Sequence, residues 1–343
     1  MDRTDRYSRQ ELFDGLGKAG QAKLSGSKVV IVGLGALGSI HAEALARAGI
    51  GELVLIDRDF VEESNLQRQI MFEESDARDR LPKAVAAASH VSRINSGIKV
   101  EPIVTDVTYA NIEQLARGAD LIMDGTDNFG TRYLINDASA KLRIPWIYGA
   151  AVGSYGLTMT VVPGVTPCLR CLFESMPEPG LTPTCDTDGV IFPIIGIIAS
   201  IQVAEAMKLL SGCADKLHRS LVRVDVWDFQ ISMFSLEEFA GSGNCPVCAE
   251  GEFEYLRGDR AQLATTLCGR DAVQVTSFDL AQIDLARLAD QLEQLGEVKC
   301  NEFLLRFCID GYDITVFRDA RSIIRGTSDP IVAKGLYSKY VGG

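Results

Sequence analysis

One stretch near the start of the sequence constrains the fold more than any other. Residues 29–32 are apolar and rich in β-branched side chains, which predicts a strand buried on both faces. The strand runs into Gly33-x-Gly35-x-x-Gly38, and an alanine-rich helical pattern follows over residues 36–48. Glycines let the backbone turn tightly and approach a ligand, and the N–H groups at a helix start favour negative charge. The stretch therefore predicts a phosphate-binding strand, loop and helix.

A second strand supports a nucleotide site. Residues 53–56 are apolar and lead into Asp57, about twenty residues after Gly38, where an acidic side chain can bind ribose hydroxyls. The glycines alone have another explanation, which is close packing of a helix on a strand. The strand before them and the acid after them favour a nucleotide, although neither identifies a reaction.

The composition is that of an ordinary globular protein. The chain has 343 residues, 47% of them hydrophobic, which is enough for a large core and a smaller annex. Its net charge of −12 argues against a nucleic-acid or anionic-membrane partner. The charged first residues do not resemble a secretory signal, so we expect a cytoplasmic protein. The apolar residues 190–201 are too short for a membrane span and predict a buried core helix.

Strand and helix patterns alternate after Asp57. A polar stretch, residues 59–80, carries Arg68, and Lys83 stands at the start of a helical pattern. The alternation predicts a Rossmann-like, doubly wound, mostly parallel sheet, and we expect an antiparallel extension of it. Arg68 and Lys83 would then lie where the phosphates of a triphosphate are bound. A solvated surface charge is the alternative for each of them.

Two carboxylates and an amide follow the strand predicted at residues 119–123. Asp124, Asp127 and Asn128 fall at its carboxyl end, where open α/β sheets bind ligands. Such oxygens could hold Mg²⁺ together with substrate phosphates. Alternatively, Asp127 or Asn128 caps the next helix. The two interpretations are compatible.

Cysteine spacing predicts a metal site. Nine cysteines include the pairs Cys168/Cys171 and Cys245/Cys248, each spaced Cys-x-x-Cys. Four thiolates in this arrangement fit a closed, structural zinc site better than buried free thiols or a redox pair. Cys185 lies between the pairs in a loop-like sequence that predicts exposure, and its acidic neighbours give no sign of a lowered pKa.

The pattern changes near residue 251. We expect residues 1–250 to form one domain and residues 251–343 a small α+β domain, to which the sequence assigns no role. The expected strands and helices of this domain are residues 272–278, 283–295, 303–309, 314–317, 321–325 and 330–340. Cys268-Gly269-Arg270 suggests a persulfide loop and Gly342-Gly343 a ubiquitin-like tail, but both signals are weak.

Taken together, the motifs from about Tyr7 to Cys248 resemble the ThiF/MoeB/HesA family, bacterial relatives of ubiquitin-activating enzymes. The residues that carry the resemblance are Arg6-Tyr7-Ser8-Arg9-Gln10, the three glycines, Asp57-x-Asp59, Ser64-Asn65-Leu66-Gln67-Arg68-Gln69, Lys83, Asp124-x-Thr126-Asp127-Asn128, the four paired cysteines and Thr184-Cys185-x-x-x-Gly189-Val190. The family adenylylates the C-terminal glycine of a small ubiquitin-like sulfur carrier, using ATP and Mg²⁺ and releasing pyrophosphate.

The resemblance implies a role for individual residues. Arg68 and Lys83 would bind the phosphates, and Asp127 would hold Mg²⁺. Arg9 would reach the neighbouring site of a homodimer, and Cys185 would be the thiol that some members use after adenylylation. The residues implied in holding the nucleotide are Gly33, Gly35, Gly38, Asp57, Asp59, Asn65 and Gln69. The carrier would serve thiamin or molybdopterin biosynthesis, with a cysteine desulfurase or another sulfur donor as a further partner.

Two other functions explain part of the sequence. A nicotinamide-dependent oxidoreductase accounts for the glycines and Asp57 but leaves Arg68, Lys83 and the paired cysteines without purpose. An inactive scaffold that binds a ubiquitin-like protein would be expected to have lost a phosphate ligand. An active adenylyltransferase also fits the absence of histidine from every motif, because a C-terminal carboxylate is already ionised at neutral pH and needs no general base.

Overall fold

The computed structural model describes residues 6–176, 185–239, 245–258, 264–267, 272–275 and 283–341. The chain divides into two compact units, Met1–Asp259 and Arg260–Gly343. The division falls close to the predicted boundary after residue 250, and independent folding of each part stays a prediction. The persulfide-loop and glycine-tail hypotheses concern residues that lie outside the described part of the chain.

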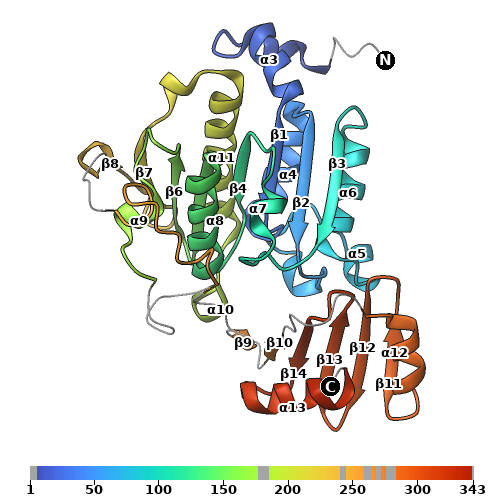
Figure 1. Ribbon diagram of the computed structural model, residues 1–343. Helices are drawn as coiled ribbons and strands as arrows, with labels where there is room; N and C mark the ends of the chain where they lie inside the picture. The colour runs from blue at the N-terminus through green and yellow to red at the C-terminus, as the bar shows by residue number, and fades with distance from the viewer. Residues whose placement is uncertain are drawn as a thin grey trace. The chain divides into compact units, whose positions relative to one another are not determined.

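The first unit is built on an eight-stranded sheet with the order β3-β2-β1-β4-β5-β6-β7-β8 (Figure 1). Its strands are β1 (Lys28–Val32), β2 (Glu52–Asp57), β3 (Lys99–Val104), β4 (Leu121–Asp124), β5 (Trp146–Val152), β6 (Tyr155–Val161), β7 (Ser220–Asp225) and β8 (Gln230–Ser235). The strands from β3 to β5 are parallel, and β6, β7 and β8 extend the sheet in antiparallel fashion. The predicted mixed, Rossmann-like sheet is therefore confirmed.

Helices cover both faces of this sheet. The helices are α2 (Ser8–Glu11), α3 (Gly17–Gly26), α4 (Ala36–Ala48), α5 (Glu74–Arg78), α6 (Lys83–Ile94), α7 (Ile112–Leu115), α8 (Phe129–Leu142), α9 (Leu169–Leu172), α10 (Cys185–Asp188) and α11 (Phe192–Ser211), with short 3₁₀ helices η1 (Glu63–Asn65), η2 (Ala214–Lys216) and η3 (Glu237–Phe239). One face buries α4, α6 and α11 against alternate residues of β1, β2 and β4. The other face buries α7, α8 and the cysteine segments. The result is a three-layer α/β unit.

The strand order reverses between β1 and β4, which places the ligand-binding crevice of such a sheet at their carboxyl ends. β1 is the central strand and ends directly before Gly33. Its neighbours β2 and β4 end at Asp57 and Asp124. The glycine loop and the two acidic residues therefore lie together at the carboxyl ends of these strands.

The long apolar helix α11 packs in the core of the first unit. It is the one helix of the described residues that is long and apolar enough to cross a membrane, and 56% of its most apolar window is buried. It contacts α3, α4, β5 and β6, and the polar side chains of Gln202 and Glu205 are fully buried within this packing. The helix therefore has the predicted character of a core helix.

The second unit has a six-stranded antiparallel sheet with the order β11-β12-β13-β14-β10-β9. Its elements are β9 (Ala264–Leu267), β10 (Ala272–Val275), α12 (Leu285–Leu292), β11 (Glu297–Cys300), β12 (Leu304–Ile309), β13 (Tyr312–Phe317), β14 (Ser322–Arg325) and α13 (Pro330–Tyr340). Both helices contribute to the apolar core on one face of the sheet. β9 and β11 were not predicted. β11 lies at the sheet edge with mostly exposed residues, so it has no apolar alternation to reveal it.

Candidate functional site

Backbone contacts, rather than side chains, shape the glycine loop. Gly33 has a φ of +84°, and a Cβ atom on Gly38 would lie 1.9 Å from the carbonyl oxygen of Gly33. A Cβ on Gly125, just after β4, would lie 2.3 Å from the same oxygen. By contrast, a Cβ on Gly35 would come no closer than 3.7 Å to another residue. The fold itself demands Gly33 and Gly38, whereas close approach of a ligand is the remaining reason for Gly35.

Asp57 holds this loop as well as facing the crevice. Its carboxylate accepts the backbone N–H of Leu34 at 2.6 Å and that of Asp59 at 2.7 Å. Burial raises the pKa of the Asp57 carboxyl, and the charge of Lys83 opposes this shift. A carboxylate has about four acceptor positions, so two remain for the hydroxyls of a ribose. The structural role of Asp57 was not predicted from the sequence.

Lys83 is a buried, positively charged residue close to Asp59, which follows the carboxyl end of β2. It is the first residue of α6, and only 5% of its surface is exposed. Its Nζ lies 3.7 Å from Asp59 Oδ2, which is longer than a hydrogen bond. A buried ammonium with one loosely placed carboxylate can still bind an anion.

Two buried amides beside the loop have unsatisfied atoms. Asn65, at the end of η1, accepts the Glu62 N–H through Oδ1, but its buried Nδ2 has no hydrogen-bond partner among the described residues. The same holds for Oε1 of Gln69, whose Nε2 lies 3.9 Å from the Cβ position of Gly35. Unsatisfied buried polar groups are rare in native proteins, and a bound ligand is one common explanation.

Of the three oxygen-bearing residues after β4, the structure leaves one available to a metal. Asp124 is fully buried, and its oxygens are occupied by Thr126, Arg132 and Gly149. Asn128 caps α8 by accepting the Thr131 N–H at 2.8 Å. Asp127 is exposed and makes no hydrogen bond to any residue that the structure describes. The predicted cap is therefore Asn128, and binding of a metal by Asp127 stays a prediction.

Arg132 is a site residue that the sequence analysis missed. It lies one turn into α8, and its Nη2 donates to the carbonyls of Thr126 at 2.7 Å and Gly149 at 3.0 Å. Its Nε donates to Asp124 at 3.2 Å. Burial raises the pKa of the Asp124 carboxyl, and Arg132 counteracts that shift. An arginine eight positions after an acidic strand end was the only available sequence signal.

The contacts of the described chain do not test the roles predicted for three other residues. Arg68 is half-buried and donates to the Ser64 carbonyl at 2.8 Å. Arg9 is exposed on α2, whose neighbour Gln10 bonds the carbonyl of Ala48 at the C-terminal end of α4. The glycine loop lies at the other end of this helix, about 20 Å away. Cys185 begins the short helix α10 rather than a loop, and its side chain lies outside the described part.

The four paired cysteines converge on one point. The Sγ atoms of Cys168, Cys171, Cys245 and Cys248 all lie within 4.8 Å of one another, with three separations of 3.8, 3.6 and 3.4 Å. Tetrahedral zinc with Zn–S bonds of about 2.3 Å requires separations of about 3.8 Å. The cluster therefore has the geometry of a metal site that joins segments distant in the sequence.

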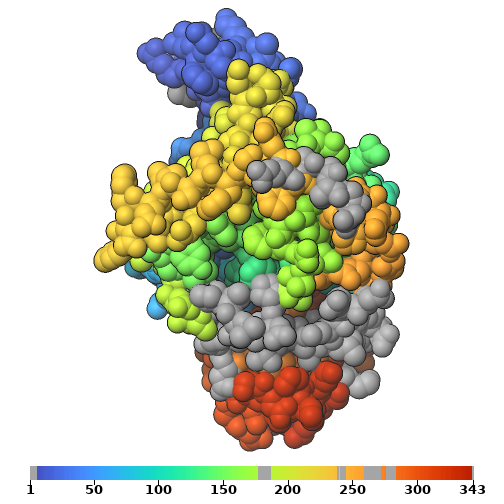
Figure 2. Space-filling view, turned by 90° about the vertical axis from the view of Figure 1, so that its left-hand side faces the viewer, coloured from blue at the N-terminus to red at the C-terminus, as the bar shows by residue number. Residues whose placement is uncertain are grey.

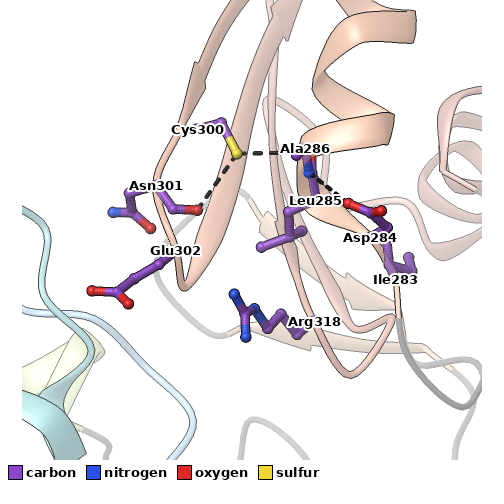
Figure 3. Close-up of a pocket in the computed structure, with 8 residues that line it drawn as sticks. All are labelled: Ile283, Asp284, Leu285, Ala286, Cys300, Asn301, Glu302 and Arg318. Atoms are coloured by element: carbon purple, nitrogen blue, oxygen red, sulfur yellow. Dashed lines mark hydrogen bonds between the residues drawn. The ribbon is translucent and has the colours of Figure 1, made fainter.

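A separate pocket of about 490 Å³ lies within the second unit (Figure 3). Figure 3 shows Cys300 and Arg318 entering it from opposite sides. Burial raises the pKa of the Cys300 thiol, whose Sγ donates to the carbonyls of Leu285 and Asn301. None of the site residues predicted from the sequence lines this pocket.

Three relatives resemble the chain, one of them along almost its whole length. The sulfur carrier protein ThiS adenylyltransferase of Bacillus subtilis is 45% identical over 343 residues, which cover 99% of this chain and all of that protein. The SAMP-activating enzyme E1 of Haloferax volcanii is 42% identical and covers 72% of this chain and 89% of its own length. The ThiS adenylyltransferase of Escherichia coli is 38% identical, with coverages of 71% and 94%.

Solved structures and a family model agree with these relatives. Escherichia coli MccB crystallised with ATP is 26% identical, with a TM-score of 0.61 over 71% of this chain and 74% of MccB. MccB with MccA-N7isoASN is 25% identical, with a TM-score of 0.63 over 73% and 75%. The ThiF family model matches residues 7–247. The fold, the glycine loop and these matches together establish that the chain belongs to the ThiF family.

Proposed function

We propose that this protein adenylylates the C-terminal glycine of a ubiquitin-like sulfur carrier of the ThiS type. The observation that carries the proposal is the set of groups around Gly35: a buried Lys83, and the unsatisfied amide atoms of Asn65 and Gln69. These groups suit a phosphate chain bound over a glycine loop. The relative matched from end to end, including the second unit, acts on ThiS, which favours thiamin biosynthesis over molybdopterin biosynthesis.

The reaction needs orientation and charge neutralisation rather than a base. A carboxylate oxygen of the carrier's last glycine attacks the α-phosphorus of ATP, the bond from this phosphorus to the β-phosphate oxygen breaks, and pyrophosphate leaves. Asp57 would hold the ribose through its remaining acceptor positions. Lys83 and Arg68 would neutralise the charge that develops on the departing pyrophosphate. The product is an acyl adenylate, which a sulfur donor or the Cys185 thiolate would attack with release of AMP.

Two metals fit the residues present. Asp127, an exposed carboxylate three residues after the end of β4, would hold Mg²⁺, which would neutralise charge on the nucleotide phosphates. The cysteine cluster would hold Zn²⁺ with all four positions filled by thiolates, and such a closed site serves structure rather than catalysis.

The distance of Arg9 from its own glycine loop supports a role in a homodimer. α4 separates the two, so Arg9 would serve the site of a second copy. Leu12 and Phe13, close to Arg9, have 69% and 70% of their surface exposed, as expected of side chains that pack on a partner. Each subunit would then complete the phosphate site of the other.

A second apolar surface is suited to the carrier. β8 is the outer strand of the antiparallel extension, and Figure 2 shows it with β7, in golden yellow, at the surface of the first unit. Ile231 of β8 is 66% exposed, and Trp227 and Phe229, in the turn before β8, are 79% and 87% exposed. Exposed apolar side chains on an unpaired strand edge are typical of a protein-binding surface.

ATP–pyrophosphate exchange tests the proposal. The purified protein with Mg²⁺ is assayed against each small protein of the source genome that ends in Gly-Gly. We expect exchange that depends on one carrier, is lost in Asp127→Ala, and is retained in Asp215→Ala, which removes an exposed surface carboxylate. Absence of exchange with every carrier, from protein shown to bind ATP, would favour the scaffold function instead.

A further inference from the structure

Beyond their last paired residues, side chains join β4 and β5. The parallel pairing of these strands ends at Met123 and Ile147. Past that point the Gly149 N–H donates to Asp124 Oδ2 at 3.4 Å, and Arg132 Nη2 bridges the carbonyls of Gly149 and Thr126. One guanidinium therefore ties Gly149, in the middle of β5, to the residue immediately before Asp127.

A second buried side chain also forms hydrogen bonds with both β4 and β5. Gln202 of α11 donates from Nε2 to the carbonyl of Asp124 at 3.3 Å and that of Ile147 at 3.2 Å. Its amide packs against Gly149, where a Cβ atom would lie 2.5 Å away. Its Oε1 accepts from His41 Nε2 of α4 at 2.9 Å. Two helices and two strands thus share one hydrogen-bonded point.

Stability alone does not account for the buried Arg132–Asp124 pair. Desolvation of two charges offsets most of their attraction, and apolar replacements of similar volume are often as stable. The guanidinium donates to the Asp124 carboxylate and to the carbonyls of Thr126 and Gly149. Its planar fork of donors reaches all three groups, which the single nitrogen of a lysine does not. Because Asp127 itself makes no hydrogen bond to a described residue, its orientation depends on these neighbours.

We propose that Arg132 is a positioning residue for adenylyl transfer. It fixes the Thr126 carbonyl and Asp124, and so holds Asp127 ready to bind the metal that accompanies the nucleotide. Gln202 keeps the strand end beneath this loop in place. Arg132 acts through Asp127 and does not touch the reacting atoms. The inference rests on the proposed function, because Asp127 is the metal ligand of that reaction.

The Mg²⁺ concentration that exchange requires distinguishes a positioning role of Arg132 from a role in folding alone. We expect Arg132→Leu to raise the Mg²⁺ concentration for half-maximal pyrophosphate exchange at least tenfold and to lower kcat at saturating Mg²⁺. ATP binding without Mg²⁺, measured by calorimetry, should stay within about twofold of the wild type because Asp57 and Lys83 are intact. Arg132→Lys should share the metal defect, since a single ammonium nitrogen cannot take the place of both Nε at Asp124 and Nη2 at the two carbonyls.

The control is Arg170→Leu, which removes a guanidinium from the ion pair with Glu254 in the same unit and should leave the Mg²⁺ requirement unchanged. A folded Arg132→Leu protein with the wild-type Mg²⁺ requirement would overturn the inference. If that variant does not fold, Gln202→Met tests the same support and should raise the Mg²⁺ requirement about threefold. Should the wild type show no exchange with any carrier, the proposed function fails, while Mg²⁺-dependent ATP binding still tests Arg132.

Discussion

Two glycines of one motif serve different purposes. Gly38 is required by the fold, because its Cβ position is occupied by the Gly33 carbonyl. Gly35 has free space around it, which leaves room for a ligand to approach the backbone. A sequence pattern treats the two glycines as equivalent, whereas the contacts assign one to packing and the other to binding.

Alanine substitution at these positions should therefore separate stability from affinity. We expect Gly38→Ala to lower the free energy of unfolding by about 3 kcal/mol, because the loop must shift to admit a methyl group. Gly35→Ala should melt within a few degrees of the wild type but bind ATP at least tenfold more weakly. Thermal melting and equilibrium nucleotide binding check both results. Equal loss of stability in the two variants would contradict this division of roles.

The buried side chain of His41 makes the stability of the fold depend on pH. It is fully buried on α4, and burial lowers its pKa to about 4 while the hydrogen bond to Gln202 opposes the shift. Between pH 4 and 6.5 the native state therefore binds fewer protons than the unfolded chain. Its contribution to stability is complete above pH 6.5 and is lost as the pH falls toward 4.

We expect the pH dependence of unfolding to weaken in His41→Gln, which can still donate to Gln202. From pH 7 to pH 4.5 the wild type should lose about 2 to 3 kcal/mol more unfolding free energy than the variant. Denaturant titrations of both proteins at the two pH values measure the difference. Parallel losses in wild type and variant would show that protonation of His41 does not destabilise the fold.

The sequence predicts the parts of the site that depend on local pattern. Lys83 begins a helix and Asp127 follows a strand that periodicity identifies, while the roles predicted for both stay predictions. The sequence could not predict the hydrogen-bond partners of Asp124. Its oxygens are taken up by Arg132 and by Gly149, a contact between strands that no spacing in the sequence reveals.

At the scale of elements, prediction succeeded where burial is strong. β1 and α4 coincide with the apolar and helical periods within one residue, because both lie in the core. β11 was missed because an edge strand has little apolar surface to bury. Pairing order is likewise a property of the folded sheet, since the partners of β1 come from residues far apart in the chain.

The cysteine cluster joins segments that are distant in the sequence, so its loss should lower the stability of the fold. We expect purified protein to carry about one zinc per chain, and Cys245→Ser to lose it with a fall in Tm of about 10 °C. ATP binding at 25 °C should change less than twofold, because none of the nucleotide groups lies in the cluster. Metal analysis, melting curves and binding measurements test this. A Cys245→Ser protein that keeps its zinc and its Tm would remove the structural role.

At the scale of the whole molecule, the separation of Arg9 from its own loop leads us to expect that a site is complete only in a dimer. Mixed dimers test this directly. Arg9→Ala and Asp127→Ala should each be inactive alone, yet a mixture allowed to exchange subunits should regain up to about a quarter of wild-type exchange activity. One site of each hybrid dimer then holds both substitutions and the other holds neither.

Titration of the mixture over time is the measurement, with each variant incubated alone as the control. Activity that stays at the level of the separate variants, in dimers shown to exchange subunits, would mean that Arg9 acts within its own chain or not at all.

The position of β1 has a consequence for how the chain folds during synthesis. The central strand is the first strand of the sheet to be made, but Val29 pairs with Leu121, and the face it shares with α4 is covered by α11, which ends at Ser211. Long-range parallel pairing of this kind is slow and leaves apolar surface exposed. A nascent chain that has not reached the end of α11 therefore carries an uncovered core, so we expect chaperone binding during this stage of translation.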